Sequence, residues 1–252
     1  MDLSLPLAGF LVGVLVGLTG MGGGALMTPF LILVVGIRPV VAVGTDLVYS
    51  AVTKIVGAAL HVRQQTVDVR LAMRLAATSL PAGLAAVALI RLLAGTGVDA
   101  DQAVRRALGV VLVVVAVVML SRMLGRPVAV SDRWRAALRG HGTLVAGAVV
   151  GAVVGFTSVG AGTLLVPFLI AVFPSSPARV VGTDVFHAAM LVTVTGLAHA
   201  HGGAVDWRLV TMMLAGSIPG VAIGSWMAPR MPVRFLRAGL ASLLLVTGVT
   251  LM

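Results

Sequence analysis

The sequence predicts an all-α polytopic membrane protein with two inverted repeats, each a glycine-broken re-entrant helical hairpin plus three transmembrane helices. Three observations lead to this prediction: an apolar composition, an internal repeat and an uneven distribution of arginine. The chain of 252 residues is 59% hydrophobic and 10% charged. Because a soluble domain carries about 25% charged residues, this composition indicates a chain that is largely surrounded by lipid.

The two halves of the chain are similar in sequence. A shift of 138 residues aligns them without a gap, and 27 of the 71 positions from Gly13 to Gly83 are then identical. We call two residues that are 138 positions apart matched residues. The repeat divides the chain into a first transmembrane repeat at 1–121, a cytoplasmic linker at 122–141 and a second transmembrane repeat at 142–252. Repeated apolar halves with glycine-broken segments at matching places are typical of secondary transporters.

Each half contains five apolar segments. They cover 3–19, 25–37, 40–62, 71–92 and 104–121 in the first half, and 142–157, 163–173, 178–200, 209–228 and 235–252 in the second. The last three segments of each half are long enough to cross about 30 Å of hydrocarbon as helices. In the linker, 131–139 is predicted to be a short interfacial helix that begins at Ser131.

The second segment of each half is too short to span a bilayer comfortably. Residues 25–37 follow a glycine-rich run at 20–24, and residues 163–173 follow a similar run at 158–162. A continuous helix tolerates such runs poorly. Two interpretations compete: the first two segments of each half form one broken crossing, or they form a hairpin that enters the membrane and returns to the same side.

The basic residues favour the hairpin. If 3–37 crosses once, the loop Lys and Arg residues divide 8 against 9 between the two sides. With hairpins they divide 12 against 5, which obeys the positive-inside rule. Both termini are then non-cytoplasmic. Because three crossings follow each hairpin, the second half is inverted relative to the first, and the two glycine tips approach each other near the midplane.

The hairpin tips are predicted to bind an anion. A helix that begins after a glycine run presents free N–H groups and partial positive charge, and nearby hydroxyls add further donors. The alternative is that these small residues only permit close helix packing. The residues assigned to the tips are Thr19, Gly22, Gly23, Gly24, Thr157, Ser158, Gly160, Ala161 and Gly162.

A repeated Gly-Thr-Asp motif places one carboxyl group inside a membrane span of each half. The motif is 44–46 in the first half and 182–184 in the second. Ionisable residues inside membranes usually face a cavity or a partner. Thr45 and Thr183 are predicted to orient the anion, while Asp46 and Asp184 carry protons or hold the broken helices. Tyr49 shares a helix face with Asp46 because it lies three positions later.

Two further residues are candidates for coupling and gating beside the two aspartates. Lys54, the only lysine of the chain, could pair with Asp46 or Asp184, supply charge to an anion, or extend to the cytoplasmic surface. His187 could shuttle protons, or it could be a hydrogen-bonded packing residue.

Several functions are excluded or disfavoured by the sequence. The chain has no cysteine, so disulfides and thiolate metal sites are excluded. It contains no glutamate and no enzyme or ATP-binding motif, so we expect neither catalysis nor a cofactor. The net charge of +10 belongs to short loops between spans rather than to a nucleic-acid site. The expected partners are a small anion, protons and the lipid bilayer, and a homodimer is compatible with the sequence.

The motif set resembles that of the TauE/SafE family of sulfite exporters. The resemblance rests on Gly20–Pro29, Gly160–Gly162 with Pro167, and the repeated Gly-Thr-Asp, and it covers essentially the whole chain. It implies transport of sulfite, an organosulfonate or thiosulfate across a bacterial inner membrane. A small neutral polar residue often follows Gly-Thr in that family, whereas Asp46 and Asp184 stand here. A cation-coupled or cation transporter that uses these acids, and a passive anion channel, remain alternatives.

Overall fold

The computed structural model describes residues 4–19, 24–123, 138–227 and 233–252. This part of the chain is helical and contains no strand. Most of the predicted interfacial helix at 131–139 lies outside the described residues.

The helices follow the sequence repeat. The first half contains α1 (Ser4–Thr19), α2 (Gly24–Leu33), α3 (Pro39–Arg63), α4 (Val69–Gly95) and α5 (Ala100–Met123). After a π-helical turn, η1 (Leu138–Gly142), the second half contains α7 (Thr143–Thr157), α8 (Leu165–Val172), α9 (Pro177–His201), α10 (Trp207–Met227) and α11 (Val233–Leu251). The bounds of α3 and α9 differ by the 138 residues of the repeat.

Six helical segments among the described residues are long and apolar enough to cross a membrane. Five of them are the predicted crossings α3, α4, α5, α9 and α10. The sixth is 138–157, where η1 extends α7, while the apolar part of α11 is shorter at 238–251. Many large apolar side chains of these helices are exposed, Val56, Leu92 and Val246 among them. Such a surface suits lipid rather than water.

Glycines spaced four apart bring helices of the two halves together. A Cβ on Gly9 or Gly13 would lie 2.8 or 2.6 Å from the backbone oxygen of Met213 or Ser217 in α10. Their matched residues Gly147 and Gly151 meet the backbone of α4 in the same way. In both pairs the residue numbers rise together, so α1 runs parallel to α10 and α7 parallel to α4. Small residues at this spacing allow helix backbones to approach closely in membranes.

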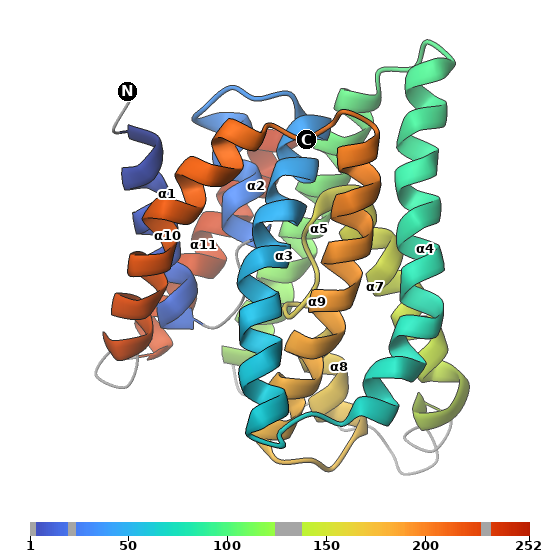
Figure 1. The fold of residues 1–252 in the computed structure, drawn as a ribbon, viewed down its shortest axis with the longest axis vertical. Coiled ribbons are helices and arrows are strands. Elements are labelled where there is room, and N and C mark those ends of the chain that lie inside the picture. The colour runs from blue at the N-terminus through green and yellow to red at the C-terminus, as the bar shows by residue number, and fades with distance from the viewer. Residues whose placement is uncertain (1–3, 20–23, 124–137, 228–232) are drawn as a thin grey trace.

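The centre of the molecule is the pair α3 and α9, with α1 and α10 on one side and α4 and α7 on the other (Figure 1). Gly57 of α3 meets Val185 of α9, and Gly196 of α9 meets Leu47 of α3. These contacts run in opposite directions along the two chains, so the matched helices α3 and α9 are antiparallel.

The short helices α2 and α8 turn back beside α1 and α7. In Figure 1, α1 begins and α2 ends at the upper end of the view, whereas α7 begins and α8 ends at the lower end. The start of α2 and the turn between α7 and α8 therefore lie in the interior of the molecule, beside α3 and α9.

Candidate functional site

The start of α2 is in contact with the turn between α7 and α8. A Cβ on Gly24, the first residue of α2, would overlap the backbone oxygen of Ser158. Ser158 ends α7 with φ +63°, and Gly160 and Gly162 have φ of +125° and +89°. Only glycine adopts these angles readily, and a serine that does so is strained. The backbone of the turn at 158–162 is thus strained at Ser158, and the contacts of the Ser158 side chain offset this strain.

Asp46 joins the two hairpins through hydroxyl groups. Its Oδ2 accepts hydrogen bonds from Thr28 of α2 at 2.7 Å and from Ser158 at 2.6 Å, and its Oδ1 accepts one from Ser50 at 3.4 Å. The side chain is fully buried. Hydrogen bonds to a carboxylate are worth more than neutral ones, so Asp46 fastens the turn of the second half to the hairpin of the first.

The matched carboxyl group, Asp184, lacks these partners. The residues that correspond to Thr28 and Ser50 are Val166 and Ala188, which carry no hydroxyl. The Oδ1 atom of Asp184 is buried and has no hydrogen-bond partner among the described residues. The backbone N–H of Gly162 is the group that donates to this carboxylate. The two aspartates therefore occupy matched positions but different chemical environments.

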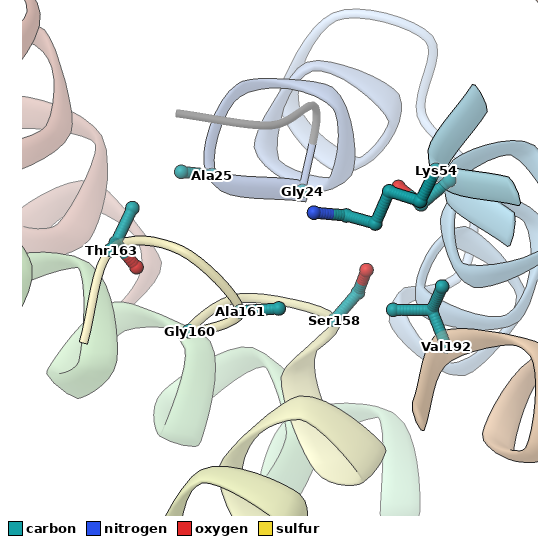
Figure 2. Close-up of a pocket in the computed structure, with 9 residues that line it drawn as sticks. Gly24, Ala25, Lys54, Ser158, Gly160, Ala161, Thr163 and Val192 are labelled. Carbon is teal, nitrogen blue, oxygen red and sulfur yellow. The ribbon is translucent and has the colours of Figure 1, made fainter. Parts of the chain in front are cut away.

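Lys54 extends into the gap between the two turns. Figure 2 shows its ammonium group beside Gly24 and Ser158. Together with Ser50, Gly160, Ala161 and others, these residues enclose a cavity of about 10 Å³, which is room for about one water molecule. Lys54 lies near both aspartates and is attracted first to Asp184 and then to Asp46. It forms no direct ion pair with any carboxylate of the described residues.

A larger cavity of about 320 Å³ lies on the other side of Lys54. Tyr49, Thr53 and His61 of α3 line it, and Asp184 of α9 lies in its wall together with Gly162 of the second turn. Asp46 is absent from its lining. The remaining wall comes from α1, α3, α9 and α10, at Val16, Gly17, Gly57, Val181, Val185, Val221 and Ser225. The cavity is thus bounded by the end of α3 that precedes Arg63 and by the start of α9.

The matched positions at the other end of the molecule are closed. Thr53, His61 and Asp184 correspond to Leu191, His199 and Asp46, which are 0%, 2% and 0% exposed. The Nε2 atom of His199 lies 3.1 Å from the backbone oxygen of Gly155. The residues matched to His199 and Gly155 are His61 and Gly17. Both of these line the larger cavity. The two halves have similar sequences but different conformations at this point.

The Gly-Thr-Asp motifs join the halves in a symmetric way. The backbone N–H of Asp206 donates to the Thr45 hydroxyl at 3.0 Å, and that of Asp68 donates to the Thr183 hydroxyl at 2.9 Å. Asp206 and Asp68 each begin a helix by accepting from the N–H three residues later. A Cβ on Gly44 would overlap the backbone oxygen of Ala204, and a Cβ on Gly182 would overlap that of Thr66. Both threonine hydroxyls are therefore engaged in the scaffold, away from the two cavities.

The remaining predicted residues fall into separate places. His187 is buried, with Nε2 2.8 Å from the Ser79 hydroxyl, while its Nδ1 has no partner among the described residues. The Thr157 hydroxyl donates to the Val153 oxygen at 2.7 Å and so belongs to the end of α7. Thr19 is the last residue of α1. Gly22 and Gly23 lie outside the described residues.

Two hydroxyl residues of the site, Thr28 and Thr163, escaped the sequence analysis, whereas Ser50 is predicted to share a helix face with Asp46. Thr28 and Ser50 bind Asp46, and the buried Thr163 hydroxyl lines the small cavity with no hydrogen-bond partner among the described residues. Thr28 lies within the glycine-proline motif of the first hairpin, and Ser50 lies one turn after Asp46. Thr163 carried no signal, since its matched residue is Ala25.

Comparison with known proteins identifies the family. The model of the "Sulfite exporter TauE/SafE" family matches residues 5–251. The chain belongs to the TauE/SafE family. A Bacillus subtilis relative called "Probable membrane transporter protein YjnA" is 42% identical over 258 residues, which cover 100% of both chains. A "Probable membrane transporter protein" of Xylella fastidiosa is 28% identical over 225 residues, 88% of this chain and 83% of its own. No solved structure matches.

These TauE/SafE relatives and the apolar helices together show that this chain is a multi-pass membrane transporter. The names within the family indicate transport rather than catalysis.

Proposed function

We propose that the protein is a proton-coupled secondary transporter of small sulfur-containing anions, such as sulfite, an organosulfonate or thiosulfate, in the bacterial inner membrane. The substrate class follows from the family description, sulfite exporter. The mechanism is alternating access at a site between the two hairpin turns. The observation that carries the proposal is a cavity on one side of this site whose matched residues, on the other side, are buried.

Inverted repeats supply the geometry for this mechanism. Residues 1–121 and 142–252 are the two repeats, and 122–141 is the cytoplasmic linker. The antiparallel packing of the matched helices α3 and α9 supports a two-fold axis in the membrane plane, because repeats of the same orientation would place these helices in parallel. The basic residues put both termini outside the cytoplasm.

The difference between matched positions supports alternating access. The cavity lined by Thr53, His61 and Asp184 faces the end of the molecule that carries Arg63, which is the cytoplasmic end by loop charge. The matched residues at the other end are buried. If the two repeats exchange their conformations, the first end closes and the second opens, and the site between the turns changes its access.

The site offers groups that bind an anion. Lys54 supplies the positive charge, and Thr163 supplies a hydroxyl beside the small cavity that has no hydrogen-bond partner among the described residues. Gly24 supplies a backbone N–H group at the start of α2, where the absence of a side chain lets an anion approach. The small cavity has room for about one water molecule, so the start of α2 and the turn at 158–162 must separate to admit a sulfite ion.

Flux measurement in proteoliposomes tests the proposal. We expect ³⁵S-labelled sulfite to accumulate when a pH gradient is imposed and to leave when the gradient is removed, with protein-free liposomes as the control. Flux that only equalises concentrations indicates a passive anion channel. Flux that follows an added cation rather than sulfite indicates a cation transporter. The absence of sulfite flux from a monodisperse, thermally stable preparation contradicts the proposed substrate.

A further inference from the structure

The two aspartates of the repeated motif are identical in sequence context but differ in what surrounds them. Three hydroxyls donate to Asp46, whereas Asp184 has an oxygen with no partner among the described residues. Asp184 lines the larger cavity and Asp46 does not. We propose that Asp184 alone carries the coupling proton and competes with the substrate anion for Lys54, while Asp46 fastens the turn at 158–162 to α2. This inference rests on the proposed function.

The division of roles follows from access and from hydrogen bonding. A group that carries a proton must meet water and must be stable in two protonation states. Asp184 meets the cavity, and its free oxygen can accept a proton without breaking an existing bond. Protonation of Asp46 would weaken its bonds to Thr28, Ser50 and Ser158. Asp46 is thus suited to remain ionised, and Asp184 is suited to change.

Charge balance couples the proton to the anion. Lys54 is the cation that acts on both acids among the described residues, and its matched residue is Val192, so that position of the second half carries no charge. When Asp184 is ionised it balances Lys54. An anion that enters then adds an unbalanced negative charge in a medium of low dielectric constant, which is costly. A proton on Asp184 removes this cost, so anion and proton bind together and move in the same direction.

The other polar groups around Asp184 do not replace it in this role. Tyr49 and His61 of α3 line the same cavity, and the Nδ1 atom of His61 lies 2.8 Å from the Thr66 hydroxyl. The lining residues from α1 and α10 are not titratable. His187, one turn further along α9, is hydrogen-bonded to Ser79 of α4. Asp68, beyond Thr183, accepts from the N–H of Leu71 at the start of α4.

The proton step is balanced in atoms and charge. A proton from the cavity adds to the Asp184 carboxylate and forms a carboxylic acid, and the anion takes the place of that carboxylate beside Lys54. After the repeats change conformation, the acid releases its proton and the anion leaves on the other side. For a monoanion the complete cycle moves no net charge. A pH gradient of one unit can then sustain about tenfold accumulation, because each tenfold ratio corresponds to about 1.4 kcal/mol.

A matched pair of variants tests the inference. Asp184→Asn and Asp46→Asn are compared with the unmodified protein in proteoliposomes, with ³⁵S-labelled sulfite as the probe. Each is measured for exchange at equal pH and for accumulation under a pH gradient of one unit. We expect Asp184→Asn to exchange sulfite but to lose accumulation, since a neutral amide mimics the protonated acid. We expect Asp46→Asn to exchange slowly yet to keep the unmodified ratio of accumulation to exchange.

Two results overturn the inference: accumulation that persists in Asp184→Asn, or accumulation that is lost only in Asp46→Asn. If Asp184→Asn does not exchange, Asp184→Glu decides, because the glutamate can still carry a proton. Accumulation in Asp184→Glu supports the inference, and exchange without accumulation contradicts it. Failure of the proposed function has a different signature, since the unmodified protein would then exchange no sulfite.

Discussion

Ser158 donates a 2.6 Å hydrogen bond to Asp46 across 112 positions of the chain, and it does so from a backbone with φ +63°. One residue of the second hairpin turn is thus held by a carboxylate that belongs to the first half. The left-handed conformation costs a serine about 1 kcal/mol or more. The charged hydrogen bond offsets this cost, because a bond to a charged group contributes about 1.5–3 kcal/mol.

Two substitutions at Ser158 separate the hydrogen bond from the backbone conformation. Ser158→Ala loses the bond and keeps the strain, so we expect it to lower the stability by about 1–3 kcal/mol. Ser158→Gly loses the same bond but relieves the strain, so it should be more stable than Ser158→Ala by about 1 kcal/mol. Thermal unfolding in detergent gives the order, with Ser121→Ala as the control at an exposed position. Equal stability of the two variants would contradict the strain at Ser158.

The sequence predicted the scaffold better than the site. Residues 40–62 and 178–200 were predicted as spans, and α3 and α9 are Pro39–Arg63 and Pro177–His201. Long apolar segments that begin at a proline give strong local signals. The partners of Asp46 could not be predicted in this way, because Thr28 and Ser158 reach it through tertiary packing. The Gly-Thr-Asp motifs themselves do not predict the difference in conformation between the halves, since Gly44 and Gly182 have the same neighbours in both motifs.

The Gly-Thr-Asp threonines provide a second contrast between scaffold and site. Because Thr45 and Thr183 accept from the N–H groups of Asp206 and Asp68, we expect Thr45→Val and Thr183→Val to lower stability by about 1–3 kcal/mol each. The affinity for sulfite should change little in the protein that remains folded. Thermal unfolding and the concentration dependence of sulfite exchange measure the two effects. A large loss of affinity with unchanged stability would return these hydroxyls to the anion site.

In the proposed site, anion binding depends on the positive charge of Lys54. Lys54→Met keeps much of the side-chain length and removes the ammonium group, so we expect sulfite binding to weaken about 30-fold or more. Arg208→Met is the matched control, because it removes one positive charge from an exposed position outside the cavities. Sulfite exchange measured over a range of concentrations distinguishes the two variants. Equal exchange in both would exclude Lys54 from the site.

Helix packing makes a prediction that does not involve transport. A Cβ on Gly151 would overlap the backbone oxygen of Ser79, whereas a Cβ on Gly239 of α11 has no neighbour within 4 Å. Gly151→Ala should therefore lower stability by about 1–3 kcal/mol. Gly239→Ala should leave stability unchanged or raise it by up to about 1 kcal/mol, because alanine favours the helix. Thermal unfolding of the two variants checks the assignment of α4 and α7 as close neighbours.

Cysteine labelling tests the difference in access between the two ends of the molecule. The chain contains no cysteine, so a single introduced thiol reports on one position. Thr53 lines the larger cavity, and its matched residue Leu191 is 0% exposed. We expect Thr53→Cys to react with a cationic, membrane-impermeant methanethiosulfonate from the cytoplasmic side, because a thiol reacts only where water can ionise it. Leu191→Cys should react slowly from either side.

Alternating access adds a reciprocal expectation to the same two variants. Any condition that slows labelling of Thr53→Cys, such as saturating sulfite on the opposite side, should speed labelling of Leu191→Cys from that side. The reason is that an exchange of conformation between the repeats buries one matched position as it exposes the other. Inside-out vesicles and right-side-out spheroplasts present the two sides separately. If Thr53→Cys and Leu191→Cys always change together, the cavity is part of a continuous channel and the repeats do not alternate.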